Sequence, residues 1–404
     1  MKKKVAVYPP KPTLYTSDLF FIERASILRK ANFIFSFSYK IYCMYLNSIL
    51  ETIGNTPLIK LNRVPQLHGI KATVLAKVEY FNPGNSVKDR IALRIVENAE
   101  QKGWLKPGGV IIEGTSGNTG TGLALVAAVK GYRCIFTTSK PASNIKIRLL
   151  KALGAQVVHC PSVPADDPRS YYSIAAALKK AIPNSYHVNQ YENPMNPQVH
   201  YETTGPEIWE QSGGNVSYVI TGTGTGGTLS GTARYLKEQN PDLKVIGVDA
   251  YGSTLKKFHE TKVVPKNEDI FGTKIEGVGK DMIPSTIAFD LIDKFVYVTE
   301  KESALRTREL ASLEGMILGY SCGAAFQGIV ELKDELTEDD VVVVIFHDHG
   351  SRYVNKMYSD EWMEEEGFNE VYEDEVTQQL RTSIERVCTA AEAITMVGMR
   401  VAQS

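Results

Sequence analysis

The sequence contains no apolar run of about 18 or more residues, the length that a membrane-spanning helix requires. Its five cysteines are odd in number and include no Cys-x-x-Cys pair. That pattern excludes a disulfide framework or a zinc cluster and is typical of a reducing compartment. The net charge of −1 gives no general attraction to nucleic acid or to an anionic membrane. We therefore expect a cytoplasmic protein with no nucleic-acid or membrane partner and no bound metal.

The N-terminal region differs from the rest of the chain. Residues 1–43 are rich in Phe, Tyr, Ser and Lys and show no sustained period of a strand or helix. The basic start resembles the first part of a secretory signal, but Pro9 and Pro10 interrupt the apolar run that should follow, so export is not expected. We expect a poorly ordered extension over residues 1–43 and hypothesise that translation begins at Met44.

From Ala72 to about Ile345, short apolar runs alternate with helix-like stretches. The apolar runs occupy Val110–Ile112, Cys134–Phe136, Val157–Val158, Val216–Ile220, Val245–Val248 and Val341–Phe346. The helix-like stretches occupy Asp89–Lys102, Gly120–Lys130, Ile145–Leu153, Thr228–Gln239 and Ser303–Glu314. This alternation predicts an α/β protein with mostly parallel, twisted sheets flanked by helices. In such sheets ligands bind at the carboxyl ends of the strands.

A lysine stands at one junction between a loop and a helix. Ser86-Val87-Lys88-Asp89-Arg90 follows the turn-forming segment 82–85 and opens an expected helix. The positive end of the helix dipole lowers the pKa of an ammonium group, and a lysine that deprotonates easily suits Schiff-base chemistry. Taken alone, the motif is more typical of an ordinary surface lysine at a helix start.

Two small-residue loops follow expected strands and open expected helices. The first is Thr115-Ser116-Gly117-Asn118-Thr119-Gly120, in which hydroxyls, an amide and free backbone N–H groups form a typical anion site. A tight turn with a hydroxyl cap is its structural alternative. No lysine ends this loop, as the nucleotide-binding P-loop would require.

The second loop is Gly222-Thr223-Gly224-Thr225-Gly226-Gly227-Thr228, where glycines let a phosphate approach the backbone closely. The same loop satisfies the dinucleotide pattern G-x-G-x-x-G through Gly222, Gly224 and Gly227. Asp249 follows at the distance where such a fold places its ribose-binding acid. A nicotinamide-dependent oxidoreductase is therefore an alternative on this evidence.

Among the other polar residues, those of the segment Gly319–Ala325 fit close helix packing and a functional role equally well, and the rest favour structural roles. Ser321 lies in the small-residue segment Gly319–Ala325 at a further expected helix start, and Cys322 within it is typical of a small packing residue. His347 and His349 flank Asp348, but with no third ligand identified they are more typical of surface polar residues than of a metal site.

Taken together and in this order, the motifs resemble those of the fold-type II pyridoxal-phosphate enzymes of the cysteine synthase and cystathionine β-synthase family, which share the fold of the tryptophan synthase β subunit. The resemblance runs from about residue 48 to 368. Its matching segments are Gly-Asn-Thr-Pro-Leu at 54–58, Ser-Val-Lys-Asp-Arg at 86–90, Thr-Ser-Gly-Asn-Thr-Gly at 115–120, Gln190-Tyr191 before Asn193-Pro194, Gly-Thr-Gly-Gly-Thr at 224–228, and Ser321.

The resemblance implies a role for each matching residue. Lys88 would hold pyridoxal 5′-phosphate covalently and, once released, remove the substrate Cα proton. Ser321 would contact the pyridine nitrogen. The substrate carboxylate would be held by Thr115, Ser116, Asn118, Thr119 and Gln190, with Asn118 also near the cofactor's 3-hydroxyl. The 5′-phosphate would be bound by Gly224, Thr225, Gly226, Gly227 and Thr228.

The resemblance also implies an organisation of the chain. Residues 44–87 together with 194–368 would form a larger domain that holds the cofactor phosphate. Residues 88–193 would form a smaller domain that holds the substrate carboxylate, and 369–404 a C-terminal tail. A homodimer is expected from the family.

Two reactions of the family remain open. The segment Glu276–Pro284 favours the cystathionine β-synthase type, in which serine and homocysteine give cystathionine. In the cysteine synthase type, O-acetylserine and sulfide give cysteine. The segment Pro206–Trp209 fits this type as well as it fits the cystathionine β-synthase type. Lys280 stands where several relatives have an aromatic or acidic residue, which leaves the preference for the second substrate open.

Overall fold

The computed structural model describes residues 45–115, 117–139, 144–164, 167–266 and 269–368, and the short stretches 379–380, 382–384 and 386–389. Three expectations lie wholly or mostly outside these residues: the poorly ordered extension 1–43 with its start at Met44, the site residue Ser116, and the tail 369–404. Within the described part, no helix combines the length and the apolar character that a membrane crossing needs.

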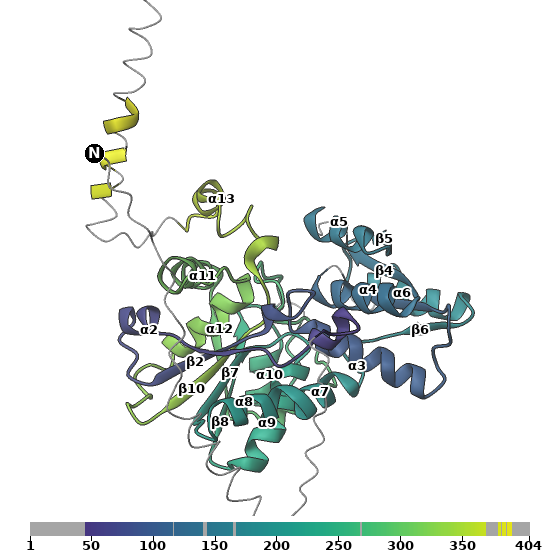
Figure 1. Cartoon of the computed structure of the whole chain (residues 1–404), viewed down its shortest axis with the longest axis horizontal. Coiled ribbons are helices and arrows are strands. Elements are labelled where there is room, and N and C mark those ends of the chain that lie inside the picture. The colour runs from purple at the N-terminus through teal and green to yellow at the C-terminus, as the bar shows by residue number, and fades with distance from the viewer. Residues whose placement is uncertain are drawn as a thin grey trace, which may run out of the picture. The chain divides into compact units, whose positions relative to one another are not determined.

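The larger of two sheets has six strands in the order β1-β2-β10-β7-β8-β9 (Figure 1). Only β1 runs antiparallel, against β2, and the other pairs are parallel. The strands are β1 (Leu58–Lys60), β2 (Thr73–Val78), β7 (Tyr218–Gly222), β8 (Lys244–Ala250), β9 (Lys294–Val298) and β10 (Val341–Phe346). The last strand among the described residues, β10, therefore occupies an inner position between β2 and β7.

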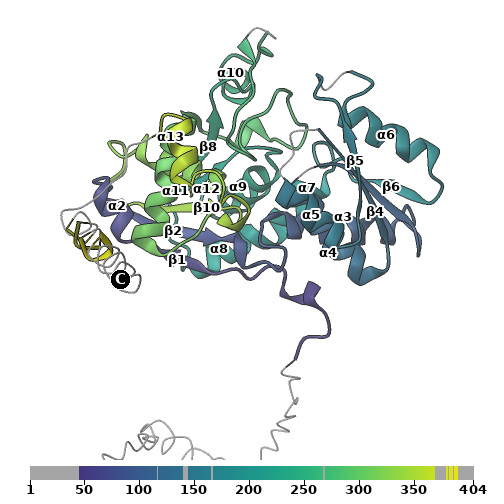
Figure 2. The same cartoon turned by 90° about the horizontal axis from the view of Figure 1, so that it is seen from above.

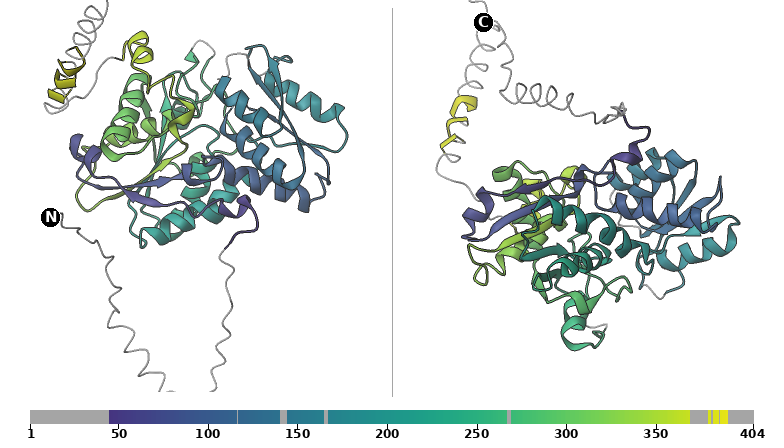
Figure 3. Two further views of the ribbon diagram at one scale, coloured as in Figure 1. Left: turned by 45° about the horizontal axis from the view of Figure 1, so that its top comes forward. Right: turned by 60° about the horizontal axis from the view of Figure 1, so that its bottom comes forward.

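The smaller sheet has four parallel strands in the order β5-β4-β3-β6. Its strands are β3 (Val110–Gly114), β4 (Arg133–Ser139), β5 (Gln156–Cys160) and β6 (Ser185–His187). All four come from one continuous stretch of chain that lies between β2 and β7 of the larger sheet. Figures 2 and 3 show this smaller sheet, with α4 and α6, beside the larger one.

Helices flank both sheets. They are α2 (Arg63–Leu67), α3 (Lys88–Gln101), α4 (Asn118–Lys130), α5 (Asn144–Ala152), α6 (Tyr171–Ala181), α7 (Met195–Val199), α8 (Gly205–Gln211), α9 (Gly227–Gln239), α10 (Leu255–Thr261), α11 (Glu300–Glu314), α12 (Tyr320–Val330) and α13 (Asp360–Glu365). In α11, Thr299 and Glu302 form a reciprocal capping box, which fixes where the helix begins.

The apolar run of β10 is buried on both faces, as expected of an inner parallel strand. Val342, Val344 and Phe346 belong to a core that also contains Phe326 of α12. Val343 and neighbouring strand residues pack on the opposite side in a core that includes residues of α8 and α9. Alternate residues therefore face helices on opposite sides of the sheet, which confirms the expected α/β architecture of parallel sheets flanked by helices.

Most differences from the expected elements occur at their ends. Helix α11 begins at Glu300 instead of Ser303. Strand β7 begins at Tyr218 instead of Val216, because Ser217 donates its backbone N–H to Val341 and only the following residues pair in register with β10. The short edge strands β1 and β6 were not expected, because each has only three residues and contains no apolar run.

Candidate active site

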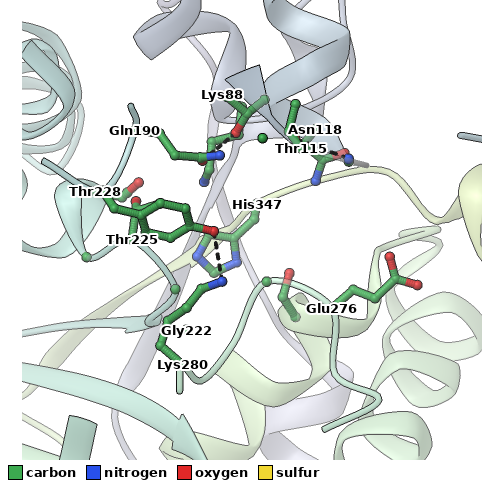
Figure 4. A pocket seen from close by; sticks show the side chains of 18 of the residues that line it. Lys88, Thr115, Asn118, Gln190, Gly222, Thr225, Thr228, Glu276, Lys280 and His347 are labelled. Atoms are coloured by element: carbon green, nitrogen blue, oxygen red, sulfur yellow. Dashed lines mark hydrogen bonds between the residues drawn. The ribbon is translucent and has the colours of Figure 1, made fainter. Parts of the chain in front are cut away.

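A cavity of about 270 Å³ lies where the two sheets present the carboxyl ends of their strands. Ten of the residues expected to bind the cofactor or the substrate line it: Lys88, Thr115, Asn118, Thr119, Gln190, Gly224, Thr225, Gly226, Thr228 and Ser321. Figure 4 shows several of their side chains converging on this space. Residues far apart in the chain are therefore brought to one place.

Lys88 opens α3 and contributes its side chain to the cavity wall. Burial lowers the pKa of its amine to about 8, although the negative charges of Asp348 and Glu79 act to raise it. Within the described residues, the amine makes no hydrogen bond. It is therefore both accessible to a ligand and much easier to deprotonate than an ordinary lysine, and burial is the main physical cause.

A buried ionic cluster fixes the helix that carries Lys88. Arg90, two residues further along α3, binds Glu79 through Nε at 2.7 Å and Glu207 through Nη1 at 2.6 Å. Lys77 of β2 also donates to Glu207, at 2.6 Å. The hydroxyl of Thr56, from the segment 54–58, donates to Glu79 at 2.6 Å. Elements from four parts of the chain are thus joined to the first turn of the helix that begins with Lys88.

The charges in this cluster hold one another in the ionised form. Burial alone would raise the pKa of Glu79, but the charge and hydrogen bonds of Arg90, with the hydrogen bond from Thr56, lower it to about 2. A buried carboxylate that stays ionised in this way depends on its partners, since an isolated charge in the interior is costly.

The glycine loop after β7 offers a set of backbone donors. Within the described residues, the backbone N–H groups from Gly224 to Thr228 find no acceptor. They lie at the start of α9, where the positive end of the helix dipole adds to their attraction for an anion. Gly226 adopts φ +77°, a left-handed conformation that glycine tolerates. The loop is therefore organised to bind a phosphate-like group.

The close approach of neighbouring backbone explains two of the glycines. A Cβ on Gly224 would lie 2.5 Å from the carbonyl oxygen of Gly277, so a side chain there would force the two loops apart. A Cβ on Gly227 would lie 2.0 Å from Oδ1 of Asn196. Unlike its neighbours, Gly227 does not line the cavity, and its place in the loop is explained by this packing.

The opposite part of the wall presents polar side chains at the start of α4. Thr119 donates its hydroxyl to Oε1 of Gln190 at 2.7 Å, which leaves the Gln190 amide N–H₂ group to other partners. Asn118 donates its amide to Asp348 at 2.8 Å and accepts a hydrogen bond from Arg352. These contacts fix the orientation of side chains that can hold a carboxylate.

Ser321 lies in the first turn of α12 and is almost fully buried. Its hydroxyl makes no hydrogen bond to a described residue, although it borders the cavity. A buried hydroxyl with no protein partner is suited to a hydrogen bond with a polar atom of a ligand.

The expectation that His347 and His349 are surface polar residues is wrong for His347. His347 follows β10 directly, is only 7% exposed and lines the cavity. Its Nε2 lies 2.6 Å from the Thr221 hydroxyl, and burial lowers its pKa to about 3, so the ring is neutral. Asp348 is fully buried and belongs to the Asn118 contacts, while His349 is half-buried.

Several cavity residues form pairs that no pattern in the sequence predicted. Lys146 pairs with Glu276, which also accepts from Lys356 at 2.6 Å. Lys280 donates to the hydroxyl of Tyr191 at 2.8 Å (Figure 4). The partners in each pair are far apart in the chain, so no local pattern could have connected them.

Asp249, expected to bind a ribose in the oxidoreductase alternative, does not line the cavity. It is fully buried, and its carboxylate accepts the backbone N–H groups of Ala250 at 3.0 Å and Lys256 at 2.9 Å. Its oxygens therefore stabilise the turn into α10 and do not face a ligand.

Comparisons with known proteins match the chain over most of its length. Residues 49–348 match the family described as "Pyridoxal-phosphate dependent enzyme". Cystathionine beta-synthase from Apis mellifera is 44% identical over 81% of this chain. Cysteine synthase 1 from Emericella nidulans is 38% identical over 80% of this chain and 87% of its own length.

A solved structure shows the same similarity in three dimensions. The O-acetylserine dependent cystathionine beta-synthase from Helicobacter pylori superposes with a TM-score of 0.71 at 35% identity. The match covers 78% of this chain and 99% of that one. The chain spans 64% of the length of the Apis mellifera relative, so similarity to that protein extends over only part of it.

Proposed function

The chain belongs to the fold-type II pyridoxal-phosphate dependent enzymes, and from that membership we propose that it replaces the β-substituent of serine or an O-activated serine with a thiol. One observation carries the proposal: the easily deprotonated amine of Lys88 faces a cavity that also offers unpaired backbone N–H groups for a phosphate.

The residues around the cavity fit this cofactor. The N–H groups of 224–228 suit its 5′-phosphate, the free hydroxyl of Ser321 suits its pyridine nitrogen, and the unbonded amine of Lys88 suits its aldehyde. A side chain at position 224 would close the phosphate site against Gly277. When bound, the cofactor withdraws electrons from the substrate Cα and weakens the bonds around it.

We propose the following roles for the protein's own residues. Lys88 would hold the cofactor covalently and, once its amine is free, would accept the substrate Cα proton. Ser321, unlike a carboxylate, does not force the pyridine nitrogen to remain protonated, which favours β-elimination over transamination. The substrate carboxylate is held by Thr115, Ser116, Asn118, Thr119 and Gln190, and the cofactor phosphate by Gly224, Thr225, Gly226, Gly227 and Thr228.

The proposed overall reaction joins serine and homocysteine to give cystathionine and water. The Cβ–O bond of serine breaks, a Cβ–S bond forms, and the thiol proton leaves with the hydroxide as water. The relatives named cystathionine beta-synthase support this choice. The cysteine synthase relative keeps the formation of cysteine from O-acetylserine and sulfide as the second candidate.

A product assay tests this function. Purified protein is given serine or O-acetylserine with homocysteine or sulfide, and the products are separated by mass. Cystathionine is expected as the main product from serine and homocysteine. Dominant formation of cysteine would favour the second candidate, and no thioether or thiol product from any combination would reject the proposal.

The oxidoreductase alternative finds no support in the site. Asp249 uses its oxygens within the protein, and the family match points to another cofactor.

We also propose that residues 44–87 and 194–368 form the part that holds the cofactor phosphate and that 88–193 hold the substrate carboxylate, since the two sheets divide at similar positions. We further propose a homodimer, which family membership supports. We also propose a cytoplasmic location, which is supported by the buried thiols of Cys134, Cys160 and Cys322, none of which forms a disulfide.

The lowered pKa of Lys88 gives a pH prediction. Only the neutral amine attacks an aldehyde, and the neutral fraction grows as the pH rises through the pKa. When cofactor-free protein is mixed with pyridoxal phosphate, the rate of covalent attachment should rise with pH and level off above a pH of about 8. Absorbance of the attached cofactor measures this rate. A rate that keeps climbing toward the ordinary lysine pKa of 10.5 would contradict the assignment.

A further inference from the structure

Lys280 lines the cavity but has no assigned role in the proposed function. Three lysines line the cavity: Lys88, Lys146 and Lys280. Lys88 is assigned to the cofactor, and the charge of Lys146 is paired with Glu276. In the part of the chain that the structure describes, Lys280 has no carboxylate partner within ion-pair distance. The site thus contains a positive charge that no carboxylate among the described residues pairs with.

The position of this charge is fixed by its surroundings. The Lys280 ammonium donates to the Tyr191 hydroxyl at 2.8 Å and lies 4.7 Å from the centre of the Tyr191 ring. Its backbone N–H donates to the Ser253 hydroxyl at 2.9 Å. The single side-chain contact leaves two of the three ammonium protons for another acceptor. A preorganised ammonium group with free donors is a site for an anion.

Lys280 also lines a second cavity. This cavity of about 630 Å³ is lined by residues that include Phe271, Thr273 and Asp281. Among the described residues, Lys280 alone lines both cavities. Lys280 therefore lies at the boundary between the two cavities.

The charge is also close enough to influence the reaction centre. Lys280 contributes to the lowered pKa of Lys88, after burial and in opposition to the acidic residues. The proposed site for the carboxylate of the first substrate is elsewhere, at Thr115, Asn118, Thr119 and Gln190. In the view of Figure 4, Lys280 and Asn118 lie on different sides of His347. Lys280 is therefore available for a second anionic group.

We propose that Lys280 binds the carboxylate of the second substrate, and that this substrate is consequently a thiol that carries a carboxylate, such as an amino-acid thiol. Sulfide has no carboxylate and cannot use this contact. The inference rests on the proposed β-replacement and refines it, because it makes Lys280 the residue that selects the thiol.

The test compares two thiols of similar size that differ in charge. 3-Mercaptopropionate carries the carboxylate, and 3-mercaptopropanol has a neutral hydroxyl in its place. Lys280→Met removes the ammonium group and keeps an unbranched stem, while Lys280→Arg keeps the positive charge. Steady-state rates are measured for both thiols and for homocysteine, with serine or O-acetylserine as first substrate.

Lys280→Met is expected to raise KM for homocysteine and 3-mercaptopropionate by roughly 10- to 100-fold, the usual effect of losing one charged hydrogen bond. KM for 3-mercaptopropanol should change by less than about threefold, and kcat should change little, since the contact exists before and during the reaction. Lys280→Arg, which keeps the positive charge, should retain most of the preference for the charged thiols over the neutral thiol. Equal effects on the charged and neutral thiols would overturn the inference.

Two measurements separate this inference from the proposed function. The spectral change that serine or O-acetylserine causes without any thiol reports the first half of the reaction, and its absence from the unmodified protein would reject both proposals. Calorimetry gives a readout independent of turnover. 3-(Methylthio)propionate should bind the cofactor-loaded protein roughly tenfold more weakly after Lys280→Met. Unchanged binding would overturn the assignment of Lys280 alone.

Discussion

Lys88→Ala is expected to lose the covalent attachment of the cofactor and to lower kcat/KM on the order of 10³-fold or more, because one amine both holds the cofactor and moves the Cα proton. The substitution removes an amine that makes no hydrogen bond to a described residue, so the fold should survive. Borohydride reduction followed by mass spectrometry measures the attachment. In the unmodified protein, the added mass should lie on the peptide that contains Lys88.

Lys102→Ala is the matched control for this substitution. Lys102 follows the other end of α3 and is exposed, so its loss should leave both the adduct and the rate unchanged. An adduct on a different lysine, or an adduct that persists in Lys88→Ala, would show that the amine is wrongly assigned. Unfolding midpoints of both variants establish that any loss of activity does not come from unfolding.

Arg90→Met is expected to lower the free energy of unfolding by about 3–5 kcal/mol, since it leaves buried carboxylates without their main partner. Arg90 binds both Glu79 and Glu207, and within the cluster only Lys77 would remain to balance them. Urea unfolding measures the change. Because α3 begins with Lys88, partial loss of cofactor binding should accompany the loss of stability.

Arg94→Met provides a control on the same helix. Arg94 pairs with Glu202 at 2.9 Å, but both side chains are about one-third exposed. Water weakens such a pair, and its loss should cost less than about 1 kcal/mol. An equal loss of unfolding free energy in the two variants would show that burial does not increase the contribution of the Arg90 cluster to stability.

The parts of the fold that follow from local pattern were predictable. The apolar run Val341–Phe346 coincides with β10, and the segments at 115–120 and 222–228 each lead from a strand into a helix as expected, with α4 beginning at Asn118 and α9 at Gly227. Edge strand β1 was not predictable, because two of its three residues are partly buried and one is exposed, and they owe their conformation to pairing with β2.

The candidate site divides in a similar way. The glycine loop and the hydroxyl-rich loop carry local signals, so their residues could be found in the sequence. His347 could not be, because a histidine after an apolar strand can face water or a cavity, and the choice depends on which loops pack around it. The paired charges of Lys146 and Glu276 are likewise a product of tertiary structure.

Strand order also has a consequence for the growing polypeptide on the ribosome. The smaller sheet is made from consecutive segments between Val110 and His187, so it can assemble as soon as that stretch has emerged. The larger sheet cannot assemble so early, because β2 pairs with β10. Thr73 of β2 therefore has no partner until Val341 has been synthesised.

Until β10 is synthesised, β2 and β7 each lack an inner neighbour and expose apolar surface and unpaired edges. Such edges are prone to aggregate. During synthesis the smaller sheet can therefore be complete while the larger sheet is still open to aggregation. We expect chaperone binding to matter most in this interval.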